Sequence, residues 1–210
     1  MTRASNPGRR FWLGAALAAL VAAGLAGCDK LGLSGSSKPS FHGVDITGAD
    51  YGRKLDLTDA EGKPRTLADF KGKVSVVFFG YTQCPDVCPT TMAELAAIKR
   101  AMGKDGERVQ GIFVTVDPER DTPEVLKAYL AAFDPSFVAL RGTPEQTADA
   151  AREFKVFFAK LDGKTPASYT VDHTAGSYVI DTQGQLRLFE RYGAPAQELQ
   201  ADLEKLLAAG

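Results

Sequence analysis

Two cysteines and one histidine are the residues of this sequence best suited to hold a soft metal ion. Cys84 and Cys88 lie four residues apart in the stretch 81–89, and His173 follows much later, directly after Asp172. Thiolate sulfur and imidazole nitrogen suit copper, and the same set also occurs in zinc sites. A separation of four residues lets both sulfurs reach one atom around a single helical turn. We therefore expect a metal site formed by the two cysteines, with the histidine as the candidate third ligand.

The segments around the cysteines predict a strand, a loop and a helix in that order. Residues 74–80 form an apolar run with β-branched and aromatic side chains, which is typical of a strand buried on both faces. Residues 90–102 favour a helix, and Pro89 suits its first position. Cys88 is then expected at the helix start, where free amide groups and the helix dipole favour thiolate over thiol. Open sheets place their sites at such strand ends.

The rest of the chain alternates further strand and helix patterns. A second buried strand is expected at 109–116, helices begin at the Thr-Pro pairs 122–123 and 143–144, and a short strand lies between them at 136–140. Residues 177–181 and 185–190 predict a hairpin, preceded by the loop that carries His173, and a closing helix starts near residue 195. This order predicts an α/β fold with a mixed central sheet flanked by helices.

The N-terminus has the pattern of an export signal. Residues 1–10 hold three arginines and no acid, and residues 11–27 are an uninterrupted apolar and small run. Residues 25–28, Leu-Ala-Gly-Cys, resemble a bacterial lipobox, in which the cysteine, here Cys28, becomes lipidated after cleavage. Asp29 follows, a residue that keeps enteric lipoproteins in the inner membrane. We expect a lipoprotein-type signal peptide at 1–27 and a lipid anchor at Cys28; the alternative is that 11–27 remains as a short transmembrane helix.

Composition limits the remaining possibilities. The chain has 210 residues, 44% of them hydrophobic, which fits one domain plus a tether. Residues 28–48 are rich in Ser and Gly and predict a flexible, lipid-anchored tether, so the folded domain is expected at 49–210. His42 falls in this tether and is expected to be solvated. The chain holds 25 basic and 26 acidic residues, which gives no indication of nucleic-acid binding, and three cysteines exclude a disulfide-dense scaffold.

The cysteine pair has two further interpretations. A structural disulfide between Cys84 and Cys88 would close a very short loop and would therefore stabilise little, although export permits it. The same two thiols could instead act as a redox-active pair. The stretch 117–121 suits a turn and a helix cap, and we assign it no role in the site.

Three stretches together resemble the Sco/SenC family of copper proteins. They are FGYTQCPDVCPTT at 79–91, VTVDPERDTP at 114–123 and VDHTAGSYVID at 171–181, and the resemblance extends from Phe41 to the C-terminus. It implies a thioredoxin-like fold with an added β-hairpin, in which the segment entering the hairpin passes beside the cysteine motif. It also implies one copper ion held by Cys84, Cys88 and His173.

The resemblance further implies a metallochaperone, not an enzyme. Its role would be assembly of the dinuclear copper centre of cytochrome c oxidase, with the oxidase's copper-bearing subunit as partner. A periplasmic copper donor or thiol reductant would be an additional partner, and the expected location is the inner membrane, facing the periplasm. The alternative is a thiol-disulfide reductase that keeps the oxidase's copper-ligand cysteines reduced.

Overall fold

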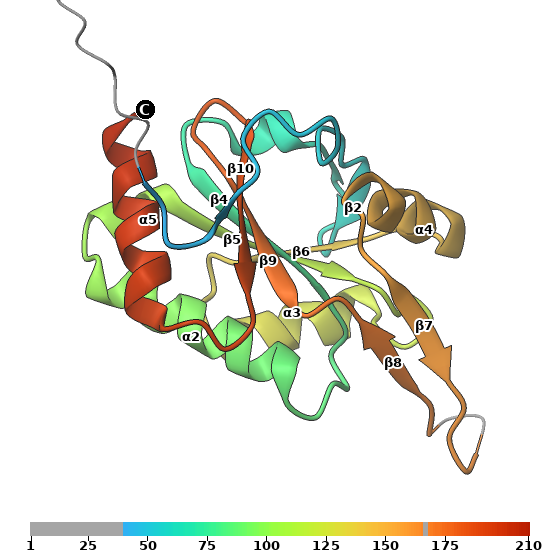
Figure 1. Cartoon of the computed structure of the whole chain (residues 1–210). Helices are drawn as coiled ribbons and strands as arrows, with labels where there is room; N and C mark the ends of the chain where they lie inside the picture. The colour runs from blue at the N-terminus through green and yellow to red at the C-terminus, as the bar shows by residue number, and fades with distance from the viewer. Residues whose placement is uncertain (1–39, 166–167) are drawn as a thin grey trace, which may run out of the picture. The chain divides into compact units, whose positions relative to one another are not determined.

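Two parallel, fully buried strands form the centre of the sheet (Figure 1). The computed structural model describes residues 40–165 and 168–210. β4 (Val74–Gly80) pairs with β5 (Val109–Thr115) along its whole length, and every residue of both strands is buried. α2 (Val87–Ala101) connects them. The two apolar runs of the sequence therefore became the inner strands, as expected.

The main sheet is mixed and has eight strands in the order β1-β10-β9-β4-β5-β6-β2-β3. β6 continues the parallel part on β5, whereas β9 and β10 form the predicted hairpin, of which β9 pairs with β4 in antiparallel fashion. The other six strands of this sheet are Val44–Asp45 (β1), Leu57–Asp59 (β2), Pro64–Arg65 (β3), Val138–Arg141 (β6), Gly176–Ile180 (β9) and Leu186–Arg191 (β10). Short 3-10 helices lie at Leu67–Phe70 and Asp105–Arg108. This arrangement confirms the predicted mixed α/β sheet.

Helices cover both faces of the sheet. Successive side chains of a strand point to opposite faces. Phe113 of β5 contacts Tyr129 in α3 (Pro123–Ala131) with ring centroids 5.5 Å apart, while Phe79 of β4 contacts Phe154 at the end of α4 (Pro144–Glu153) at 5.3 Å. α3 thus covers one face and α4 the other. α5 (Ala196–Ala208) packs beside α2 (Figure 1).

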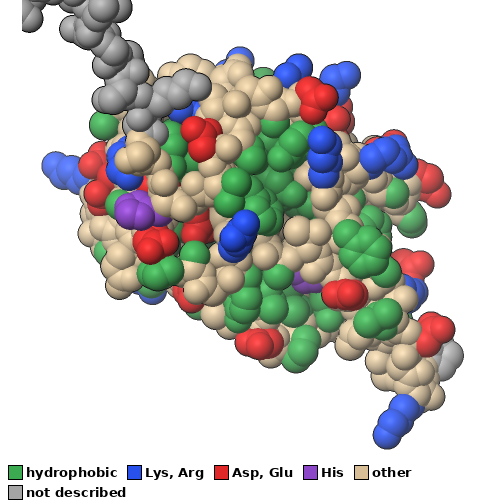
Figure 2. Space-filling view, viewed as in Figure 1, with side chains coloured by type: hydrophobic (Ala, Val, Ile, Leu, Met, Phe, Trp, Pro, Cys, Tyr) green, Lys and Arg blue, Asp and Glu red, His purple; other side chains and the backbone are tan. Residues whose placement is uncertain are grey.

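A second hairpin stands outside the main sheet. β7 (Phe158–Leu161) and β8 (Thr170–His173) form an antiparallel pair of their own, which we call the arm. It projects at the lower right of Figures 1 and 2, and charged side chains gather toward its tip. The sequence interpretation was wrong here, since it placed His173 in a loop. The mixed apolar and charged residues of β7 show no strand alternation, so no local pattern indicated the arm.

The folded unit begins at Ser40, earlier than the predicted boundary at residue 49. β1 pairs with β10, and the buried Asp202 of α5 accepts hydrogen bonds from the backbone amides of His42 and Gly43 at 2.7 and 2.9 Å. Residues 40–48 therefore belong to the domain and not to a tether, although the His42 side chain is exposed as expected.

The predicted signal peptide at 1–27, the Cys28 lipid anchor and tether residues 28–39 lie outside the described residues. Across the part of the chain that the structure describes, every helix is too short or too polar to cross a bilayer.

Candidate metal centre

The cysteine loop joins the end of β4 to the start of α2. Cys84 lies in this loop and is partly exposed, whereas Cys88 is fully buried in the first helical turn. The helix begins at Val87, two residues before the predicted start at Pro89. Proline is still tolerated there, because the N–H groups of the first helical turn have no intrahelical acceptor, so the N–H that proline lacks costs the helix no hydrogen bond. The absence of a side chain at Gly80 lets the Cys88 sulfur pack against the end of β4, since a Cβ at Gly80 would lie 2.9 Å from that sulfur.

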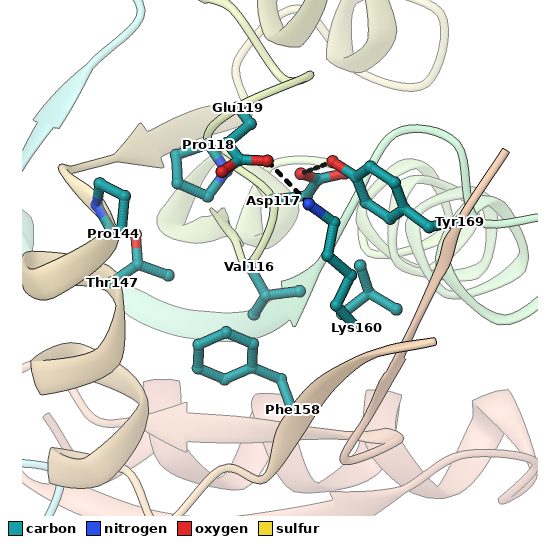
Figure 3. A pocket seen from close by; sticks show the side chains of 10 residues that line it. Val116, Asp117, Pro118, Glu119, Pro144, Thr147, Phe158, Lys160 and Tyr169 are labelled. Carbon is teal, nitrogen blue, oxygen red and sulfur yellow. Dashed lines mark hydrogen bonds and ion pairs between the residues drawn. The ribbon is translucent and has the colours of Figure 1, made fainter. Parts of the chain in front are cut away.

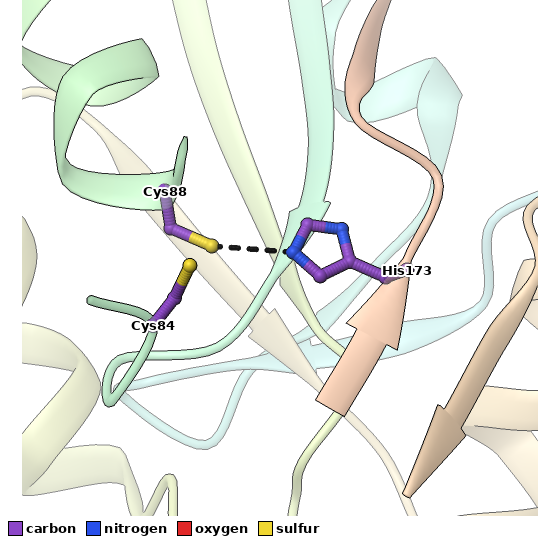
Figure 4. Close-up of side chains that lie close together, drawn as sticks. All are labelled: Cys84, Cys88 and His173. Atoms are coloured by element: carbon purple, nitrogen blue, oxygen red, sulfur yellow. Dashed lines mark hydrogen bonds between the residues drawn. The ribbon is translucent and has the colours of Figure 1, made fainter. Parts of the chain in front are cut away.

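The arm delivers the histidine to the two cysteines. His173 is the last residue of β8, and its Nε2 lies 3.4 Å from the Sγ of Cys88 (Figure 4). The two sulfurs and a ring nitrogen all lie within 4.8 Å of one another. The structure thus brings together the three residues that the sequence singled out, although they come from separate elements.

Hydrogen bonding and ring packing orient His173, and burial favours its neutral form. Its Nδ1 lies 3.1 Å from the carbonyl oxygen of Thr174; a carbonyl can only accept, so Nδ1 carries the proton and Nε2 presents its lone pair to the sulfurs. Burial lowers the pKa of His173, which favours the neutral form that binds metals. The ring also packs edge-on against Phe78 and Tyr81, with centroids 5.8 and 6.0 Å away. These contacts hold Nε2 in place for binding.

Cys88 differs from the sequence expectation in its protonation. Burial raises the pKa of the Cys88 thiol, and the neighbouring Cys84 raises it further. The expectation that the helix start favours thiolate at Cys88 was therefore wrong, because the effect of burial on the pKa outweighs that of the backbone hydrogen bond at Tyr81, which lowers it. Both cysteines are free thiols. A metal ion that binds Cys88 has to displace its proton.

The loop after β5 supports the cysteine loop in a way that the sequence interpretation missed. Asp121 is fully buried, and its carboxylate accepts hydrogen bonds from the backbone N–H and the hydroxyl of Thr82, and from the hydroxyl of Thr115 at 2.6 Å. We had interpreted 117–121 only as a turn and a helix cap. The available signal was its position, since these charged residues follow β5, which pairs directly with the strand that leads into the cysteine loop.

Two thiols, one on a loop and one at a helix start, and an imidazole at a strand end form a compact three-donor set at the carboxyl end of β4. Such a set leaves a side open to an incoming ligand. A thioredoxin-like α/β domain with a dithiol-imidazole centre is the class of protein that this fold and site define. The chain belongs to the SCO1/SenC family, whose sequence profile matches residues 44–208.

Individual relatives agree with this membership. The chain is 40% identical over 157 residues to the mitochondrial protein SCO2 of Saccharomyces cerevisiae; the match covers 74% of this chain and about half (51%) of that relative. The solved structure of Bradyrhizobium japonicum ScoI with copper bound is 42% identical, with a TM-score of 0.68, and the match covers 75% of this chain and 99% of that one. A SCO1/SenC family lipoprotein from Bacillus anthracis is 28% identical, with a TM-score of 0.60, covering 73% and 92%.

Proposed function

We propose that this protein binds one copper ion through Cys84, Cys88 and His173 and delivers it to the copper-bearing subunit of cytochrome c oxidase during assembly. The observation that carries the proposal is the convergence of the three donor atoms within 4.8 Å. The copper bound to the Bradyrhizobium relative supports the choice of metal, and the sequence resemblance to the Sco/SenC family supports the delivery role.

The copper-bound relative decides between copper and zinc, because the donor set alone does not. Soft thiolates bind Zn(II) as well as Cu(I), and two cysteines with one histidine and an open position also occur in catalytic zinc sites. Among residues 40–165 and 168–210, the three donors form the only group of three or more His, Cys, Asp or Glu side chains close enough to hold an ion. The histidine is neutral and aimed at the sulfurs, so a three-coordinate copper ion needs little rearrangement of this chain.

The unequal exposure of the cysteines suggests an order of transfer. Cys84 is partly exposed and Cys88 is buried. A thiolate of the acceptor first bonds to the copper from the open side, and the bond from copper to the Cys84 sulfur breaks. A second acceptor ligand then displaces Cys88, whose thiolate takes up a proton from water, and the bond from copper to the His173 nitrogen breaks last as a further acceptor ligand binds. Copper keeps its oxidation state in this exchange.

The proposed location is the bacterial inner membrane, facing the periplasm, with the chain anchored by lipid on Cys28. The signal pattern at 1–28 supports it, and so does the Bacillus anthracis relative, which is described as a lipoprotein. A periplasmic copper donor and a thiol reductant are the additional partners proposed, since the pair must be reduced to load copper.

A thiol-disulfide reductase is the second candidate, and the free thiols of Cys84 and Cys88 favour it. In that reaction the Cys84 thiolate attacks a disulfide of the oxidase subunit and forms a mixed disulfide. Cys88 then loses its proton and attacks the Cys84 sulfur, which leaves a disulfide here and two reduced thiols on the partner. Dithiol exchange needs no imidazole.

His173→Ala separates the two candidates because it keeps both thiols and removes one copper donor. We expect cells with this variant to lose assembly of the oxidase copper centre, measured as oxidase activity and copper content. His42→Ala is the matched control, since the His42 side chain is exposed and lies in the N-terminal segment. Full assembly with His173→Ala, together with failure of Cys84→Ser, would establish the reductase instead.

A further inference from the structure

Arg120 lies between the loop that carries the cysteines and the arm that carries the histidine. It follows β5, and only 14% of its side chain is exposed. One nitrogen, Nη1, donates to the backbone carbonyl of Tyr169 at 2.8 Å and to the Oε1 of Gln83 at 3.2 Å. Gln83 precedes Cys84, and Tyr169 is the residue before the first residue of β8. One guanidinium group therefore contacts both the loop that carries Cys84 and the arm that carries His173.

A buried set of contacts holds Arg120 in this position. Asp117 forms an ion pair with its Nε, and the guanidinium carbon lies 3.5 Å from the centroid of the Tyr169 ring. The Tyr169 hydroxyl in turn donates to Asp117 at 2.7 Å (Figure 3). The planar guanidinium stacks on the Tyr169 ring and donates hydrogen bonds from its edge at the same time, which a lysine ammonium cannot do; its buried Nη2 has no hydrogen-bond partner among the described residues. Arg120, Asp117 and Tyr169 thus form a closed triangle, which we call the Arg120 triangle.

The packing between the arm and the body of the domain is incomplete beside this triangle. A cavity of about 150 Å³ separates them, and Val116, Phe158 and Val171 are among its lining residues. An exposed ion pair between Lys160 and Glu119, 2.9 Å long, also bridges the gap (Figure 3). Exposed ion pairs of this kind contribute little to stability. The buried Arg120 triangle therefore adds a polar link between the arm and the body of the domain at a place where their packing is incomplete, and the exposed pair adds little to it.

We propose that Arg120 is a positioning residue that sets the placement of His173 relative to Cys84 and Cys88 and so completes the three-donor copper site. It contacts none of the three donor residues itself. Its guanidinium fixes the cysteine loop through Gln83 and the arm through Tyr169, so that the imidazole enters the site without a further ordering cost. The inference rests on the proposed copper function, which it deepens.

Copper binding by the purified, reduced full chain in detergent tests the proposal. Arg120→Gln removes the charge and the forked geometry. We expect its Cu(I) affinity, measured by competition with a chromophoric chelator, to fall roughly 10- to 100-fold, which is typical for a residue that orients a metal ligand. Arg120→Lys keeps the charge, and we expect it to restore only part of the affinity.

Lys160→Gln is the matched control, because it removes the exposed bridge across the same gap. We expect its affinity to stay within about twofold of the wild type, in line with the small value of surface pairs. An equal loss in Lys160→Gln and Arg120→Gln would overturn the specific role of Arg120, and so would an unchanged affinity in Arg120→Gln.

Hydrogen-deuterium exchange of the copper-free chain supplies a readout that does not depend on metal binding. In Arg120→Gln, or in Arg120→Lys if the first variant does not fold, we expect faster exchange at residues 170–174 and unchanged exchange in β4 and β5. Faster exchange throughout the sheet would show general destabilisation and overturn the proposal. If the wild type bound no copper, the proposed function would fail, while faster exchange confined to 170–174 would still support this role of Arg120.

Discussion

The loops that follow β4 and β5 leave the same edge of the sheet, yet their polar side chains have opposite surroundings. The loop after β4 carries Cys84 at the surface and leads into Cys88. The loop after β5 buries the carboxylates of Asp117 and Asp121 and pairs them with neighbouring donors. The difference agrees with the proposal that the three donors are exposed on one side for exchange and are positioned by the neighbouring loop, whose buried carboxylates bind hydrogen-bond donors of the protein instead.

Removal of a sulfur donor from the first loop has the largest expected effect. We predict that Cys88→Ser lowers Cu(I) affinity by more than about 100-fold, beyond the range expected for a residue that only orients a ligand. Chelator competition measures the affinity, and thermal unfolding checks that the fold is kept. If Cys88→Ser lost less Cu(I) affinity than Arg120→Gln, the comparison would fail, because copper binding would then depend more on the loop after β5 than on the cysteine donor.

The second loop is expected to matter for stability. Asp121→Asn replaces a carboxylate that accepts from three donors with an amide that has one acceptor oxygen. We predict a loss of about 2 kcal/mol in the free energy of unfolding, because the partly buried donors of Thr82 and the buried hydroxyl of Thr115 then share one acceptor oxygen. Urea unfolding of the copper-free chain measures it.

Asp149→Asn is the control for Asp121→Asn, since the Asp149 side chain is 71% exposed. We expect it to change the unfolding free energy by less than about 0.5 kcal/mol. Similar losses in the two variants would contradict the rigid support assigned to the second loop.

The pH dependence of copper binding tests whether the Cys88 proton is displaced when copper binds. Burial raises the pKa of the Cys88 thiol, so the copper-free chain holds this proton at neutral pH and copper has to displace it. Cu(I) affinity should therefore rise with pH, by about tenfold per pH unit for each proton displaced. Competition titrations at pH 6.5, 7.5 and 8.5 measure the slope. A flat profile would mean that Cys88 is not bound as a thiolate.

The sequence predicted those parts of the fold that follow from local patterns. The apolar runs became β4 and β5, and the caps at Thr122 and Thr143 begin α3 and α4, with Thr143 in a capping box with Gln146. It failed where tertiary contacts decide the structure. β1 has only two residues, both exposed, and its pairing with β10 depends on contacts across the whole chain.

The candidate site was predictable in its donor atoms but not in its support. Residue types and the family resemblance singled out Cys84, Cys88 and His173. No spacing rule could show that burial raises the pKa of the Cys88 thiol, or that Arg120 donates a hydrogen bond to Tyr169, 49 residues away in the sequence. Both depend on which side chains the folded chain brings together.

X-ray absorption at the copper edge of the Cu(I)-loaded full chain tests the central claim most directly. The account predicts two sulfur donors and one nitrogen donor in the wild type, and loss of the nitrogen in His173→Ala with both sulfurs kept. Identical spectra for the wild type and His173→Ala, or a wild-type copper ion without two sulfur neighbours, would contradict it.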